Sequence, residues 1–127
     1  MKPHLGDVIQ DPAAGTGGFL IAADQYIKRE TDNLYDLSAE EQKFQKDQAF
    51  VGMELVHDTA RLGLMNLLLH DIHGRLHIAD TLSSNGEKLP QADVVLTNPP
   101  FGTKKGGGGP TRQDFTFPTS NKQLAFL

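Results

Sequence analysis

The sequence DVIQDPAAGTGGFLIAADQYI, residues 7–27, decides the fold. A short apolar stretch at 7–10 leads into a glycine-rich segment at 11–18, and a segment of helical character follows at 19–27. This order predicts a β-strand, a tight loop and an α-helix. Such a unit is typical of α/β domains, in which helices connect parallel strands.

The glycine-rich loop is the first candidate binding site. Gly15, Gly17 and Gly18 allow sharp turns and let backbone amides come close to a small ligand. Their spacing is not Gly-x-Gly-x-x-Gly, and no Gly-Lys-Ser/Thr is present, which disfavours dinucleotide and P-loop nucleotide sites. A tight connection without any ligand explains the glycines equally well, so the loop needs support from other residues.

The remaining chain alternates between strand-like and helix-like segments. The polar stretch 31–48 predicts a surface helix capped by Ser38, and strands are expected at 49–54, 75–80 and 93–97, the last of them buried. Apolar residues at a spacing of four predict the strongest helix of the chain: Val56, Ala60, Leu64, Leu68 and Ile72, with Met65 and Leu69 beside them. The alternation implies a parallel sheet with right-handed crossovers.

Composition narrows the class of protein. A chain of 127 residues with 38% hydrophobic residues fits one domain with a modest core. The net charge of -4 disfavours a DNA-binding protein that grips the duplex unaided. There is no cysteine, which excludes disulfides and thiolate zinc sites, and the five histidines lack the spacing of a metal site. Without an apolar run of membrane length, we expect a soluble cytoplasmic protein and no membrane partner.

Three carboxylates follow the first three predicted strands. They are Asp11, Glu54 and Asp80. In an open parallel sheet, ligands bind beyond the carboxyl ends of the strands, where these three side chains would gather. The second could accept both hydroxyl protons of a ribose, and the third could accept from an exocyclic amine. Singly each acid is more often a solvated loop residue, but together they predict a nucleoside pocket.

The sharpest signal is Asn98-Pro99-Pro100-Phe101, directly after the last predicted strand. The two prolines fix their own backbone torsions, and Pro99 also restricts Asn98. The corner then offers two acceptors, the Asn98 side-chain oxygen and the Pro99 carbonyl, to the two hydrogens of an amino group. Phe101 adds a flat face on which a flipped-out base could stack. The competing interpretation is a proline-stiffened loop beside a core phenylalanine.

With both motifs identified, a family resemblance emerges. Residues 11–20 resemble the methionine-binding motif of amino-methylating DNA methyltransferases, and residues 98–101 resemble their catalytic motif. Residues 52–54, 60–70 and 120–127 are similar to the modification subunit of type I restriction-modification systems. The resemblance implies an α/β fold of the class I S-adenosylmethionine-dependent methyltransferase type, a Rossmann-like three-layer α/β/α sandwich. We expect about four strands in the spatial order 3-2-1-4.

The resemblance also implies roles for individual residues. The cofactor S-adenosylmethionine would be bound by Asp11, Ala13, Gly15 and Gly17 at its methionine part, by Glu54 at the ribose, by Leu55 against the adenine and by Asp80 at the adenine amine. The catalytic motif would be Asn98, Pro99, Pro100 and Phe101, with the first two residues holding the target amine and the last stacking on the target base. No metal is implied.

The implied reaction is methyl transfer to the N6 amine of adenine in double-stranded DNA, with specificity and restriction subunits of the type I complex as partners. Residues 1–127 would be a partial catalytic domain: 1–97 bind the cofactor, 98–101 act, 102–119 form a mobile loop and 120–127 begin a helix. Two departures are Ala14, where the family usually has cysteine, and the ten residues before Asp11, too few for an upstream motif, so the isolated chain is expected to be inactive. Alternatives are methylation of protein glutamine or an RNA base, and a non-catalytic assembly fragment.

Overall fold

The computed structural model describes residues 2–100, 114, 125 and 126. Its elements are β1 (Ile9–Asp11), α1 (Gly18–Glu30), α2 (Ala39–Asp47), β2 (Phe50–Glu54), α3 (His57–Leu69), β3 (Arg75–Ile78), the 3-10 helix η1 (Gly86–Lys88) and β4 (Val94–Val95). The expected mobile loop at 102–119 and Phe101 lie outside the described residues, apart from the exposed Asp114. Of the helix expected at 120–127, Ala125 is helical and buried.

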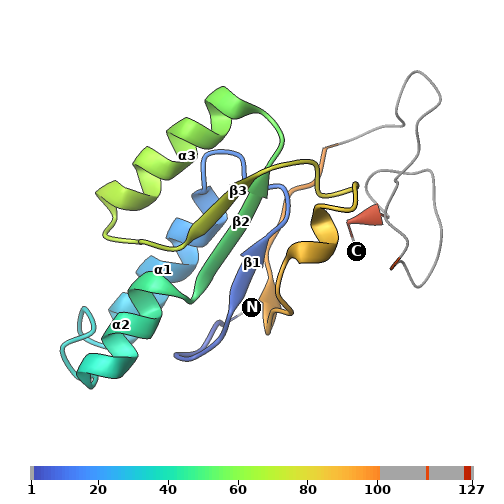
Figure 1. Cartoon of the computed structure of the whole chain (residues 1–127). Helices are drawn as coiled ribbons and strands as arrows, with labels where there is room; N and C mark the ends of the chain where they lie inside the picture. Colours follow the sequence, from blue (N-terminus) through green and yellow to red (C-terminus); the bar gives the residue numbers. More distant parts are fainter. Residues whose placement is uncertain (1, 101–113, 115–124, 127) are drawn as a thin grey trace.

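The four strands form one parallel sheet in the order β3-β2-β1-β4, which confirms the predicted topology. The register places Asp11 beside Gly52, and Glu54 beside Ile78. All four strands therefore end at one edge of the sheet, the edge to which the predicted site belongs (Figure 1). Parallel strands can be joined only by crossover connections, and the intervening helices supply them.

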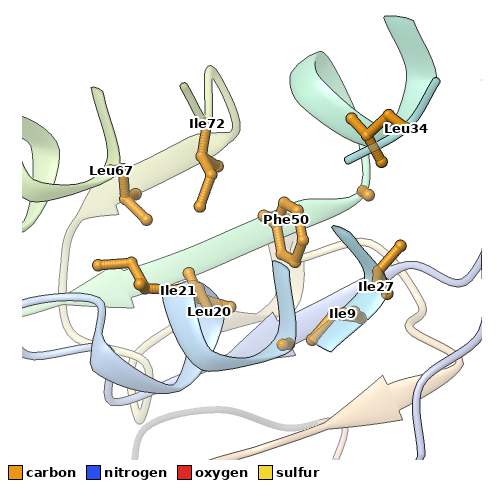
Figure 2. Packing of buried hydrophobic residues seen from close by; sticks show 10 residues of the cluster. Ile9, Leu20, Ile21, Ile27, Leu34, Phe50, Leu67 and Ile72 are labelled. Carbon is orange, nitrogen blue, oxygen red and sulfur yellow. The ribbon is translucent and has the colours of Figure 1, made fainter. Parts of the chain in front are cut away.

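The hydrophobic core lies between the sheet and its helices. Phe50 of β2 is buried at its centre, with Leu20 and Ile27 of α1 and Leu67 of α3 around it (Figure 2). Ile9 of β1 faces the same cluster. Because strand side chains alternate between faces, Gln10 lies on the opposite face, where its amide Nε2 donates to the Pro90 carbonyl over 2.9 Å. The connection that contains η1 thus covers the second face of the sheet at β1. The predicted three-layer α/β/α sandwich has α-helices on that face.

The start of α2 is set by local chemistry. The Ser38 hydroxyl accepts from the backbone N–H of Glu41, and the Glu41 carboxylate accepts from the backbone N–H of Ser38 over 2.9 Å. This reciprocal capping box satisfies backbone donors that a helix start otherwise leaves unpaired. The predicted cap at Ser38 is confirmed.

The strongest predicted helix is present as α3, but of the residues at a spacing of four that predicted it, only Ala60 is buried within the helix. In α3 the buried residues are Ala60, Gly63 and Leu67, at the i, i+3, i+7 spacing of one helix face. A spacing of four advances 400° along a 3.6-residue helix, so each step drifts by about 40° and the series leaves the sheet. Four apolar side chains of α3 are exposed: Leu62, Met65, Leu68 and Leu69. Val56 is also exposed, and Ile72 is buried but follows the end of the helix.

The predicted buried strand at 93–97 was also only partly correct. The structure has a two-residue strand, Val94–Val95, and Val95 is exposed. Among the described residues β4 pairs with β1 alone, so it is an edge strand and one side lacks a neighbour. No helix within the described part of the chain is long and apolar enough to span a bilayer.

Candidate functional site at the carboxyl edge of the sheet

The glycine loop connects β1 to α1 in a tight, hydrogen-bonded turn. Gly15 and Gly17 have φ values of 54° and 81°, a left-handed conformation that favours glycine. The backbone N–H of Ala14 donates to the Met53 carbonyl over 2.9 Å, and that of Gly17 donates to the Ala14 carbonyl over 2.8 Å. The first bond ties the loop to the end of β2, and the second closes a turn within the loop. The first turn of α1 has no side-chain cap and no acidic residue, so its amides are available to an anionic group.

Glu54 at the end of β2 bonds directly to this loop. Its Oε2 accepts from the backbone N–H of Gly15 over 2.9 Å, and its Oε1 accepts from the backbone N–H of Val56 over 2.8 Å. The carboxylate is therefore held in one orientation. Each carboxylate oxygen has a second acceptor position, so both could still accept from neighbouring hydroxyls. The structure thus places the carboxylate of Glu54 against the glycine loop.

The residues that follow β2 and β3 lie at the same edge of the sheet as the glycine loop and Glu54. Leu55 is 60% exposed and offers an apolar side chain beside Glu54. Asp80 lies half-buried after β3, where its Oδ1 accepts from the backbone N–H of Leu82 over 2.9 Å. The next residue, Thr81, is buried and donates its hydroxyl to the Pro12 carbonyl over 2.6 Å. This bond ties the Asp80 segment to the glycine loop across the sheet edge.

Asp11 occupies a different environment from the one expected. Asp11 is buried, with only 1% of the residue exposed, and its Oδ1 accepts from the backbone N–H of Ala13 over 3.0 Å. The pKa of Asp11 is raised above its usual value, chiefly because burial disfavours the charged carboxylate, and the charge of Glu54 adds to this shift. The Thr97 hydroxyl and the Ala13 amide act in the opposite direction but do not cancel it. The Thr97 hydroxyl is close but makes no hydrogen bond of good geometry. Asp11 therefore shapes the loop from inside, and Ala13 behind it is half-buried.

The predicted catalytic corner follows β4 at the same edge. The backbone N–H of Leu96 donates to the Gln10 carbonyl over 2.9 Å, which holds the chain beside β1 up to Thr97. Asn98 and Pro100 are exposed and Pro99 is half-buried, so the corner faces outward next to the loop. Of the predicted site residues, ten are brought to one edge of the sheet in this way: Asp11, Ala13, Gly15, Gly17, Glu54, Leu55, Asp80, Asn98, Pro99 and Pro100.

The sequence analysis missed residues of α3 that support the loop. Asn66 Nδ2 donates to the Thr16 carbonyl over 3.0 Å, and Gly63 packs so closely that a Cβ there would lie 2.9 Å from the Gly15 carbonyl oxygen. A signal for the second was present, because a glycine inside a helix destabilises it unless close packing requires one. A shallow hollow lined by Leu5 and Phe44 lies at the opposite end of the strands and is separate from this edge.

The comparisons with known proteins agree with this geometry. The sequence model of the N-6 DNA Methylase family matches residues 1–127. The chain belongs to the N-6 DNA methylase family. It is 54% identical over 133 residues to the type I restriction enzyme StySPI methylase subunit of Salmonella potsdam, and 52% identical to the EcoKI methylase subunit of Escherichia coli K12. All of this chain matches, but it spans about a quarter, 25%, of each of these relatives.

Solved structures of type I restriction enzyme modification proteins share the fold. The crystal structure of the EcoKI M protein matches with a TM-score of 0.91 and 53% identity, covering 98% of this chain and 27% of that one. A modification subunit of a putative type I restriction enzyme from Vibrio vulnificus matches with a TM-score of 0.73 and 32% identity, covering 99% of this chain and 26% of that one. The predicted α/β methyltransferase fold is thereby confirmed.

Proposed function

We propose that this chain carries the S-adenosylmethionine-binding and catalytic core of a type I modification methylase that transfers a methyl group to the N6 amine of adenine in double-stranded DNA. One observation carries the proposal. The glycine loop, Glu54, Asp80 and the Asn98-Pro99-Pro100 corner come from four parallel strands and meet at one edge of the sheet. Membership of the N-6 DNA methylase family supports the same reaction.

The residues present fit the cofactor. The amides at the start of α1 suit the methionine carboxylate, and the fixed carboxylate of Glu54 suits two ribose hydroxyls. Leu55 would pack against the adenine, and Asp80 would accept from its amine. When bound, the cofactor supplies a methyl group on a positively charged sulfur. Among the described residues, no group of three or more His, Asp or Glu side chains lies close enough to hold a metal ion.

The catalytic work of the chain is positioning and proton handling. The Asn98 oxygen and the Pro99 carbonyl would accept from the two N–H groups of the target adenine amine and direct its nitrogen lone pair towards the methyl group. As the nitrogen forms its new bond it becomes positive, so both acceptors stabilise the developing charge more strongly than the starting amine. The carbon–sulfur bond would break as the nitrogen–carbon bond forms, with its electron pair remaining on sulfur, and the methylated amine would then release one proton to water. Phe101 would stack on the flipped-out base.

The proposed partners are double-stranded DNA and the specificity and restriction subunits of a type I complex. The similarity to type I methylase subunits supports this, as does a match, at 31% identity and a TM-score of 0.77, to a structure on complex assembly of the type I restriction-modification system. The net charge of -4 agrees with DNA contacts supplied in part by another subunit or domain.

A methyl-transfer assay tests the proposal. The complete gene product is incubated with its specificity partner, duplex DNA and isotope-labelled S-adenosylmethionine, and nucleosides from digested DNA are analysed by mass spectrometry. We expect label in N6-methyladenine. Label in RNA or in protein glutamine under the same conditions would support the alternative substrates. Cofactor binding without any transfer would support an assembly role, and the 127-residue chain measured in parallel is expected to bind more weakly than the complete product.

A further inference from the structure

Helix α3 contacts the glycine loop through one face. Gly63 lies against the Gly15 carbonyl oxygen, and Leu67 lies under Gly17, where an added Cβ would be 3.2 Å from the Leu67 Cδ2. Between these two residues on the helix surface, Asn66 Nδ2 donates to the Thr16 carbonyl over 3.0 Å. Three consecutive loop residues are thus held by three residues of α3 at the i, i+3, i+4 spacing of a single helix face.

The bond from Asn66 fixes one particular peptide unit. The carbonyl of the Thr16–Gly17 peptide accepts from Asn66, and the N–H of the same peptide donates to the Ala14 carbonyl over 2.8 Å. Both polar ends of the peptide plane are therefore held from opposite sides. Rotation of this plane changes the ψ of Thr16 and the φ of Gly17, and the φ of Gly17 is 81°, in a region where glycine turns at little cost.

The helix that supplies Asn66 is itself attached to α1. The backbone carbonyl of Asn66 is 2.8 Å from His70 Nδ1, and the His70 carbonyl accepts from Lys28 Nζ over 2.8 Å. Lys28 forms an ion pair of 2.7 Å with the buried Asp24, one turn earlier in α1. Because α1 follows directly from the glycine loop, these contacts attach α3 to the same helix that continues from the loop.

We infer that Asn66 is a positioning residue for the cofactor: it holds the Thr16–Gly17 peptide in the orientation that receives S-adenosylmethionine. The inference rests on the proposed function. Asn66 itself touches the loop and not the reacting atoms, so it acts through the shape of the loop. Its loss should weaken cofactor binding and loosen the loop, whereas the transfer step of the loaded enzyme should proceed at nearly its normal rate.

The test compares Asn66→Asp with wild type in the complete gene product. The substitution keeps the size of the side chain but replaces the N–H donor by an oxygen that faces the Thr16 carbonyl. We expect the dissociation constant for S-adenosylmethionine, measured by calorimetry, to rise about three- to tenfold, the range for one lost hydrogen bond. The rate at saturating cofactor should stay within about twofold of wild type. Asn66→Gln, which keeps a donor, should recover part of the affinity.

Amide hydrogen exchange without cofactor gives a second readout. Residues 15–18 should exchange faster in Asn66→Asp, while β2 is unchanged. Arg61→Ala, an exposed position on the same helix, serves as the control and should alter neither measurement. Unchanged affinity and unchanged exchange in Asn66→Asp would overturn the inference. If wild type binds no cofactor, the proposed function fails instead, and the exchange experiment still decides whether Asn66 holds the loop.

Discussion

Replacing Glu54 by glutamine removes a single negative charge from the centre of the proposed site while keeping the shape of the side chain. Each oxygen of Glu54 accepts one backbone N–H, from Gly15 at 2.9 Å and from Val56 at 2.8 Å. In Glu54→Gln one oxygen becomes an NH₂ donor, which faces one of these N–H groups and can no longer accept from a ribose hydroxyl. The variant should therefore lose one charge-assisted bond to the cofactor.

The expected magnitude follows from that single bond. Hydrogen bonds to charged groups contribute about 1.5 to 3 kcal/mol, which corresponds to about 10- to 150-fold in a dissociation constant. Because Glu54 is half-buried and partly screened by water, we expect the lower part of this range, about 10- to 30-fold. Calorimetric titration with S-adenosylmethionine measures it. Asp58→Asn, at an exposed carboxylate at the start of α3, is the matched control and should bind like wild type.

A cofactor analogue without the two ribose hydroxyls separates a direct contact from a change in loop shape. Wild type should bind this analogue more weakly than the cofactor, and Glu54→Gln should reduce the affinity for the analogue much less than the affinity for the cofactor. Equal losses for both ligands would show that Glu54 acts only through Gly15 and the loop. An unchanged dissociation constant for the cofactor would remove Glu54 from the binding site altogether.

Three further predictions concern catalysis, pH and packing. Asn98→Ala should lower single-turnover methylation about 100-fold or more with cofactor affinity retained, and near-normal turnover would refute the mechanism. Phe101→Ala should weaken binding of the flipped base by about 1 to 3 kcal/mol, whereas Phe101→Tyr should keep most activity. Burial raises the pKa of Asp24 above 3.8, so the folded state binds the proton more tightly than the unfolded state, and wild type should lose stability relative to Asp24→Asn as pH rises from 3.8 through the raised pKa. Urea titrations at several pH values check this, and an equal pH dependence of the two proteins would contradict it. Gly74→Ala should destabilise by about 1 to 3 kcal/mol in thermal unfolding, because a Cβ there would collide with the Phe50 carbonyl, and an unchanged melting temperature would mean that β3 can shift.

Local sequence patterns were sufficient for the parallel character of the sheet. The alternation of strand and helix predicted parallel strands with right-handed crossovers, and the resemblance to class I methyltransferases implied the order β3-β2-β1-β4 that the structure has. The capping box at Ser38 was also predictable, since it depends on residues only three apart. The position of Glu54 at the carboxyl end of β2 was also predictable, because the alternation of strand and helix marks where that strand ends.

What the sequence by itself determined is the set of elements, their order and the edge of the sheet at which Glu54, Asp80 and Asn98 gather. Only the tertiary structure decided that α3 buries Ala60, Gly63 and Leu67, that Asp11 lies inside the sheet edge, and that Asn66 reaches the glycine loop 50 residues earlier. The physical reason is range. Periodicity and caps depend on neighbours along the chain, whereas the face that a helix buries and the partner of a distant amide depend on how closely two backbones approach, which no local pattern records.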